Sequence, residues 1–255
     1  MNPPDSRAIL DRRARFPRGL IQPEGGYRFS LDSLLLACFA RPGRRHAGVD
    51  LGCGCGVVGL GLLLHEPGLT LTGVELDPVA ADAARNNAQE LYFASQFNII
   101  QDDIRTWRPQ RVADFVVANP PFRRIGAGRV SRGGERAAAR FEQRADFAAF
   151  ARCAAVALKT RGKFSFVHLP ERLGEIMAAL AANGLEPKRL RLVHARPDEE
   201  ARMVLVQAVK AARPGLRVEP SLILHAGRGA QTRITDEALA FCPFLGCNPG
   251  EIPAR

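Results

Sequence analysis

A glycine-rich turn at residues 52–56 constrains the fold of this chain more than any other feature. It connects a short apolar strand to an apolar helix that runs to about residue 65. Gly52, Gly54 and Gly56 lie in the turn, where glycine allows sharp turning and the close approach of the backbone to a ligand. A strand, a glycine turn and a helix in this order are typical of a nucleotide-binding α/β sheet, although the pattern alone is weak.

The rest of the chain continues the alternation of strands and helices. Helices are expected at about 57–65, 79–90, 145–158 and 171–182, and strands at about 48–51, 70–75, 97–101, 114–118, 162–168, 188–194 and 203–210. Asp77 followed by Pro78 is typical of a helix N-terminus. This alternation predicts an α/β fold with a mainly parallel sheet covered by helices on both faces.

Three parts are expected along the chain. They are a basic N-terminal extension at 1–47 with a helix expected to cover the bound ligand, a core at 48–210 and a C-terminal extension at 211–255 that belongs to the same domain. The Gly- and Arg-rich segment 211–235 is expected to be irregular, and the tail 242–255 to be coil.

Charge is distributed unevenly along the chain. The chain has 36 Lys+Arg and 26 Asp+Glu, a net charge of +10. Residues 1–47 contribute +5, residues 48–122 contribute −5 and residues 123–255 contribute +10. The densest cluster, at 123–144, holds seven arginines and is also expected to be an irregular insertion. A basic field beside a site is expected for nucleic acid. The residues predicted to contact it are Arg123, Arg124, Arg136 and Arg140.

The chain carries no signal for a membrane or a disulfide scaffold. Its dense apolar run, 57–64, is too short to cross a bilayer, and its N-terminus lacks an apolar stretch behind the arginines. Six scattered cysteines predict free thiols in a cytoplasmic protein. No metal site is expected, because Cys242 and Cys247 would need two further ligands nearby.

Acidic residues at the strand ends favour S-adenosylmethionine as the ligand of the glycine turn. Asp50 can hold the cationic amino-acid end of this cofactor, whereas it would repel a pyrophosphate. Glu75 can accept hydrogen bonds from both ribose hydroxyls, but the same acid would also serve NAD. Asp103 could reach the adenine amine; Asp102 competes for that role, and a turn or cap residue is the alternative for Asp103.

Asn119-Pro120-Pro121-Phe122 directly follows the strand 114–118, at the same edge of the sheet as the glycine turn. It resembles the (Asp/Asn)-Pro-Pro-(Tyr/Phe) motif of methyltransferases that act on planar amide or amine nitrogens. Such a nitrogen is a poor nucleophile, because its lone pair is delocalised. Asn119 Oδ1 and the Pro120 carbonyl can accept its two N–H bonds, the prolines stiffen the loop, and Phe122 can stack on a base.

Between residues 22 and about 210 the chain resembles the bacterial tRNA1(Val) adenine-37-N6 methyltransferases. The most specific match is QPEGGYRFSLDSLLLA, at 22–37, and the others include DLGCGCGVVGL, GVELDP, QDDI and ANPPF. The resemblance implies a seven-stranded, Rossmann-like class I methyltransferase fold with an antiparallel last strand. It also implies cofactor contacts at Tyr27, Phe29 and Asp32. Two positions depart from the family: Phe122 replaces a common Tyr, and Phe141 replaces a common His.

Together these observations predict methylation of adenine N6 in structured RNA, most simply a tRNA, by a monomer. The predicted catalytic residues are Asn119, Pro120, Pro121 and Phe122. The predicted cofactor contacts are Tyr27, Phe29, Asp32, Asp50, Gly52, Cys53, Gly54, Gly56, Glu75, Leu76, Asp103, Ile104 and Asn119.

Two other methyltransferase classes share the Asn-Pro-Pro-aromatic motif and stay open. Protein glutamine methyltransferases usually carry a helical substrate domain before the glycine turn, but only 47 basic-rich residues precede the core here. Ribosomal-RNA guanine-N2 methyltransferases often carry a second, degenerate copy of the domain, and this sequence shows no repeat.

Overall fold

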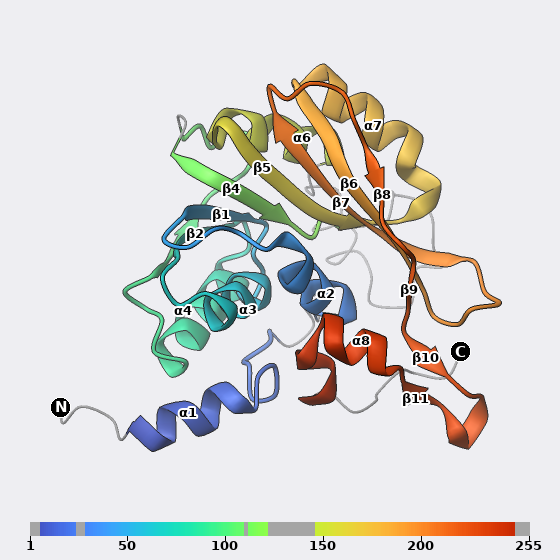
Figure 1. Cartoon of the computed structure of the whole chain (residues 1–255). Helices are drawn as coiled ribbons and strands as arrows, with labels where there is room; N and C mark the ends of the chain where they lie inside the picture. The colour runs from blue at the N-terminus through green and yellow to red at the C-terminus, as the bar shows by residue number, and fades with distance from the viewer. Residues whose placement is uncertain (1–5, 24–28, 110–111, 122–145, 248–255) are drawn as a thin grey trace, which may run out of the picture.

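The computed structural model describes residues 6–23, 29–109, 112–121 and 146–247 of the 255-residue chain. Its centre is one sheet with the strand order β3-β2-β1-β4-β5-β7-β6-β8, with β9 also paired to β6 (Figure 1). The strands of this sheet are β1 (Ala47–Leu51), β2 (Thr70–Glu75), β3 (Phe97–Gln101), β4 (Ala113–Ala118), β5 (Leu158–His168), β6 (Leu185–His194), β7 (Ala201–Lys210), β8 (Arg217–Val218) and β9 (Leu222–Ile223).

The strand directions confirm the predicted fold class. Strands β3, β2, β1, β4 and β5 run parallel, whereas β7 lies antiparallel between β5 and β6. The last long strand along the chain is therefore inserted antiparallel into the sheet, as expected. The two short strands β8 and β9 extend the sheet beyond the seven strands that the sequence predicts.

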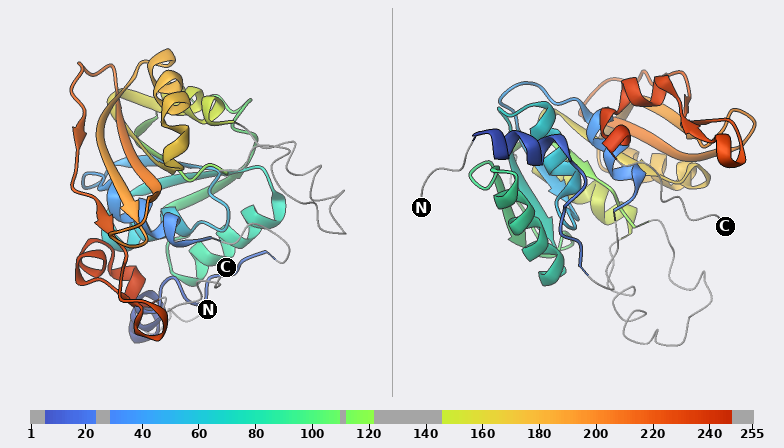
Figure 2. Two further views of the ribbon diagram at one scale, coloured as in Figure 1. Left: turned by 90° about the vertical axis from the view of Figure 1, so that its right-hand side faces the viewer. Right: turned by 90° about the horizontal axis from the view of Figure 1, so that it is seen from below.

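Helices cover both faces of the sheet (Figures 1 and 2). Between the helices and the sheet lie two hydrophobic cores. The described helices are α1 (Ser6–Ala14), α2 (Leu31–Ala40), α3 (Val57–His65), α4 (Pro78–Glu90), α6 (Phe147–Ala157), α7 (Leu173–Ala182) and α8 (Asp236–Phe241), with 3-10 turns η1 (Pro170–Arg172), η2 (Gly229–Gln231) and η3 (Pro243–Cys247). One core joins α2, α3, α4 and α8 to one face of the sheet, and the other joins α6 and α7 to the opposite face. Val116 and Val117 show the division, because successive strand residues point to opposite faces and these two fall in different cores.

Local chemistry accounts for the helix boundaries near the site. Asp77 Oδ1 accepts a hydrogen bond of 2.9 Å from Val79 N, and Pro78 is the first residue of α4, as predicted. Asp146 caps α6 in the same way through Ala149 N at 2.9 Å. The helix α6 is shorter than expected, because the following strand begins at Leu158 rather than at about residue 162.

The C-terminal extension is ordered, which corrects two expectations. Segment 211–235 forms β8 and β9, the hairpin of β10 (His225–Ala226) with β11 (Arg233–Ile234), and η2. The tail from Cys242 forms η3 rather than coil, while residues 248–255 lie outside the described part. Two-residue strands are too short to show an alternating pattern, so the sequence gives no signal for them.

The two extensions pack against the same layer of helices. Cys242 Sγ lies 3.4 Å from the Leu34 carbonyl oxygen in α2, and Phe244 contacts Phe16 and His65 with ring centroids 4.9 and 4.7 Å apart. At the other end, the Arg13 guanidinium donates to the Leu91 and Tyr92 carbonyls at 3.0 and 3.2 Å, and so satisfies backbone acceptors at the C-terminus of α4. The helix α1 itself was not predicted from the sequence.

In the described part of the chain, the longest helix has 13 residues, and no helix has both the length and the apolar composition needed to cross a membrane.

The close packing of α3 on the sheet generates a stability prediction. A Cβ on Gly59 would lie 2.4 Å from the buried ring of Phe97, whereas a Cβ on Gly174 in α7 would meet no atom within 4 Å. We expect Gly59→Ala to destabilise the protein by roughly 1–3 kcal/mol, because the clash outweighs the better helix propensity of alanine. Gly174→Ala, the matched control, should be neutral or stabilising in urea unfolding. Equal midpoints for the two variants would contradict this account of the packing.

Candidate active site

The candidate site lies where β1, β2 and β4 end side by side. Leu51 pairs with Val74 of β2 on one side and with Ala118 of β4 on the other. The residues that follow, Gly52, Glu75 and Asn119, therefore emerge at one edge of the sheet. The chain leaves β1 toward β2 and later returns to the other side of β1 as β4, so this edge is the switch point of the strand order, where α/β sheets bind ligands.

The glycine turn has a backbone conformation that explains its sequence. Gly52, Gly54 and Gly56 have φ angles of +66°, +55° and +84°, a left-handed region that favours glycine. Gly52 N and Cys53 N donate to the Val74 carbonyl oxygen at 2.8 and 3.2 Å, which ties the turn to β2. A Cβ at Gly54 would meet no atom within 4 Å, so the space beside this residue is open to a ligand.

Glu75, at the end of β2, stabilises this turn by accepting hydrogen bonds from backbone N–H groups. Its Oε2 accepts a hydrogen bond from Gly54 N at 2.8 Å, and its Oε1 accepts one from Asp77 N at 2.9 Å. Burial raises the pKa of Glu75, while the bonds from Asp77 and Gly54 lower it. A carboxylate can accept about four hydrogen bonds, so each oxygen keeps capacity for a donor such as a hydroxyl.

Asp50 lies beneath the turn and is the more deeply buried acid, with 1% of its surface exposed. Its Oδ2 accepts a hydrogen bond of 3.0 Å from Gly59 N in the first turn of α3. Burial raises the pKa of Asp50 to about 7; the Gly59 bond opposes this rise, and the charge of Glu75 adds to it. A buried acid beside a second acid is best stabilised by a cation, so this pair fits a positively charged ligand.

Asn119 directly follows β4 and is fixed at one end of its amide. Its Nδ2 donates a hydrogen bond of 2.9 Å to Ser33 Oγ in α2, a residue 86 positions away in the sequence. Its Oδ1 is buried and has no hydrogen-bond partner among the described residues. A buried acceptor without a partner is costly, so this oxygen is suited to a donor supplied by a bound molecule.

The other predicted contacts have varied surroundings. Asp32 is buried in the first turn of α2, Phe29 packs on the same core, and Leu76 is exposed beside Glu75. Ile104 is buried in the core beneath α6. Pro120 is buried and Pro121 is half-buried.

Asp103 accepts hydrogen bonds from Arg105, both from its backbone N at 2.8 Å and from its side chain, which lowers the pKa of Asp103. It thus forms the turn that the sequence offers as an alternative, and its contact with the adenine stays a prediction. The remaining predicted residues lie outside the described part: Tyr27, Phe122, Arg123, Arg124, Arg136 and Arg140.

Sequence reasoning missed two side chains. Ser33 accepts a hydrogen bond from Asn119, although serine near a helix start suggests only a cap. Asn87 in α4 is 1% exposed and joins the N-terminal segment to the glycine turn. Its Oδ1 accepts from Ile21 N at 2.7 Å, and its Nδ2 donates to the Ile21 and Cys55 carbonyls, each at 2.9 Å. The only sequence signal for this contact was an asparagine within the helix expected at 79–90.

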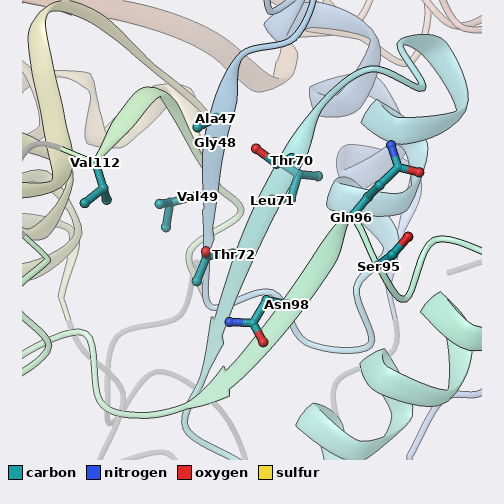
Figure 3. A pocket seen from close by; sticks show the side chains of 10 residues that line it. All are labelled: Ala47, Gly48, Val49, Thr70, Leu71, Thr72, Ser95, Gln96, Asn98 and Val112. Atoms are coloured by element: carbon teal, nitrogen blue, oxygen red, sulfur yellow. The ribbon is translucent and has the colours of Figure 1, made fainter.

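A separate pocket lies over the first residues of β1, β2 and β3, away from this edge (Figure 3). Its polar lining comes from Thr70, Thr72, Ser95, Gln96 and Asn98. None of its lining residues ionises, so it offers no acid, base or charged anchor. Within the described residues, no group of three or more His, Cys, Asp or Glu side chains gathers as a metal site.

Comparison with curated sequences gives relatives over most of the chain. A tRNA1(Val) (adenine(37)-N6)-methyltransferase from Aliivibrio salmonicida is 25% identical over 205 residues, which cover 80% of this chain and 86% of the relative. A protein of the same name from Cronobacter sakazakii is 33% identical over 153 residues, which cover 59% of this chain and 61% of the relative.

Solved structures share the fold. A protein of Agrobacterium tumefaciens, described as a predicted O-methyltransferase, aligns with a TM-score of 0.68 at 22% identity, over 84% of this chain and 96% of that one. A geranyl diphosphate C-methyltransferase from Streptomyces coelicolor A3(2) aligns with a TM-score of 0.52 at 14% identity, over 70% and 76% of the two chains. At these identities the matches show a class I methyltransferase fold alone.

The family model of the methyltransferase small domain matches residues 31–169. This range begins with α2, which carries Ser33, and includes the glycine turn and Asn119. Because it spans more than half of the sequence, the chain belongs to the methyltransferase small domain family and is a methyltransferase.

Proposed function

We propose that this protein transfers the methyl group of S-adenosylmethionine to N6 of an adenine in structured RNA, with a tRNA as the expected substrate. The observation that supports it most is the buried Oδ1 of Asn119, which lacks a partner among the described residues. An exocyclic amine carries two N–H donors and matches this acceptor. The relatives named above act, by their names, on adenine 37 of a tRNA.

The acidic surroundings of the glycine turn suit this cofactor. S-adenosylmethionine supplies an electrophilic methyl group on a cationic sulfur, and its amino-acid end carries an ammonium group. The buried carboxyl of Asp50 gains a favourable charge partner from that ammonium, whereas a pyrophosphate would raise the electrostatic cost. Glu75 stands at the end of β2, where its free lone pairs can accept the ribose hydroxyls.

Asn119 and Pro120 activate the amine by accepting its hydrogens. The lone pair of an adenine N6 is delocalised into the ring, which makes the nitrogen a weak nucleophile. Hydrogen bonds to Asn119 Oδ1 and to the Pro120 carbonyl draw the nitrogen toward a tetrahedral arrangement and stabilise the positive charge that develops on it. As the N–C bond forms, the C–S bond breaks, and the nitrogen then releases a proton to water. Positioning supplies the rate, so no strong general base is needed.

The proposed RNA contacts come from the arginine-rich segment of the sequence that follows the Asn-Pro-Pro-Phe motif. The loop that joins β6 to β7 holds Arg196, and Arg202 follows in β7; both pair with Glu199, at 2.9 and 3.0 Å. Arg228 of the β10–β11 hairpin similarly pairs with Asp198. These arginines already have carboxylate partners within the protein, and we propose as RNA contacts the arginines at 123, 124, 136 and 140, which directly follow the Asn-Pro-Pro-Phe motif in the sequence.

Asn119→Ala tests the proposed role of the amide. We expect the kcat of methyl transfer to fall by about 10²–10³, the usual effect of removing one such polar group from a transition state. The cofactor Kd should stay within threefold, because Asp50 and Glu75 remain. A labelled-methyl assay with RNA and calorimetry with S-adenosylhomocysteine measure the two quantities. A kcat within threefold of wild type would contradict this role.

The pKa of Asp50, about 7, predicts a pH-dependent affinity for the cofactor. A protonated Asp50 cannot pair with the ammonium, so binding must first ionise it. Affinity should therefore be full above pH 7 and weaken by up to about tenfold per unit as the pH falls below 7. S-adenosylhomocysteine, which keeps the amino-acid end, is a suitable probe between pH 5.5 and 8.

The matched controls for this experiment are two isosteric variants. Asp50→Asn should bind weakly and with little pH dependence over this range. Glu75→Gln should also bind less tightly but keep the slope, with its midpoint moved somewhat below pH 7, because the charge of Glu75 raises the pKa of Asp50. A slope that persists in Asp50→Asn would show that another group is responsible.

A further inference from the structure

Ser33 makes a long-range contact in the site that the motif itself does not contain. It lies in α2 and is 3% exposed. Its Oγ accepts the hydrogen bond from Asn119 Nδ2 at 2.9 Å. The two residues come from elements on either side of the glycine turn in the sequence, so only the folded chain brings them together.

The chemistry of a primary amide makes this contact decisive. An asparagine side chain has one acceptor end and one donor end of nearly the same shape, and hydrogen-bond partners decide which end points where. With Nδ2 held by Ser33, the end without a partner among the described residues is Oδ1. The reversed amide would present N–H groups to the N–H groups of an exocyclic amine, and two donors cannot bond to each other.

Contacts at several points along α2, the helix that carries Ser33, hold it against the sheet and the C-terminal extension. Gln207 Nε2 donates to the Ala40 carbonyl at 3.1 Å, and the Arg189 guanidinium lies over the Phe39 ring, 4.4 Å from its centroid. Cys242 Sγ contacts the Leu34 carbonyl oxygen at 3.4 Å. Strands β6 and β7 and the C-terminal extension thus hold α2, and with it the position of the Ser33 hydroxyl.

We propose that Ser33 is a positioning residue for methyl transfer: its hydroxyl accepts the Asn119 Nδ2 hydrogen and thereby aims Oδ1 at the amine of the substrate. This inference rests on the proposed function. Ser33 touches neither the amine nor the cofactor in this scheme, so its loss lowers kcat and leaves binding unchanged. Loss of one such hydrogen bond corresponds to about a tenfold lower kcat.

A double-mutant cycle between Ser33→Ala and Asn119→Asp tests the proposal. A carboxylate presents an oxygen at either end, so it needs no partner to select its orientation, and the (Asp/Asn)-Pro-Pro motif admits Asp. We expect Ser33→Ala to lower kcat about tenfold with the natural Asn119, and by less than twofold in the Asn119→Asp background. KM for RNA and the Kd for S-adenosylhomocysteine should stay within twofold throughout.

Two further variants separate positioning from a general loss of structure. Ser33→Thr keeps the hydroxyl and should retain at least half of the wild-type kcat, even if the Asn119→Asp enzyme is too slow to measure. Asn183 at the end of α7, on the opposite face of the sheet from α2, also makes one side-chain hydrogen bond, from its Nδ2 to the Ala179 carbonyl at 2.8 Å. Asn183→Ala is therefore the matched control, with some loss of thermal stability and an unchanged kcat.

The outcomes distinguish this proposal from the proposed function. Equal losses from Ser33→Ala in both backgrounds, or no loss with the natural Asn119, would overturn the role of Ser33 while Asn119→Ala stays inactive. If the Asp background cannot be measured, a Ser33→Thr enzyme as slow as Ser33→Ala would overturn it. Full activity in Asn119→Ala would instead overturn the proposed function itself.

Discussion

The parallel pairing of β1 with both β2 and β4 is the constraint on which the rest of the site depends. It places the glycine turn, Glu75 and Asn119 at one edge, although they lie far apart in the sequence. A one-residue shift of β1 would turn Val49 and Leu51 toward the face on which Gly48 lies against the Phe115 ring, where a Cβ would come within 2.2 Å of that ring. The geometry of the cofactor and substrate groups thus follows from the packing of a single short strand.

The C-terminal extension contacts both β6 and the helix α2. Its strands lengthen the sheet along β6, and α8 and η3 pack against α2. The extension thus supports α2, whose Ser33 bonds to the amide of Asn119, although none of the described residues of the extension contributes a group to the site. A segment that composition suggests to be irregular therefore stabilises the helix that orients the motif.

The sequence predicts those parts of the molecule that follow from local patterns. The parallel strands, the cap at Asp77 and the position of Asn119 directly after β4 all come from short-range signals in strands, turns and glycines, whereas the order of the strands was not predicted. The contact of Asn119 with Ser33, and that of Asn87 with Ile21 and Cys55, were not predictable, because each joins residues more than thirty positions apart through tertiary packing. The ion pair of Asp103 with Arg105 was open for another reason: a carboxylate after a strand serves equally well in a turn or at a ligand.

The central claim is that the site presents hydrogen-bond acceptors to the exocyclic amine of an adenine in RNA. The most direct test is incubation of the full chain with methyl-labelled S-adenosylmethionine and total RNA from cells that lack this enzyme, followed by nucleoside digestion and mass spectrometry. The account predicts that the label appears in N6-methyladenosine. Label in N2-methylguanosine would support the amine chemistry but contradict the choice of base. Label on a ribose oxygen, or only on glutamine when protein is offered, would contradict the claim itself.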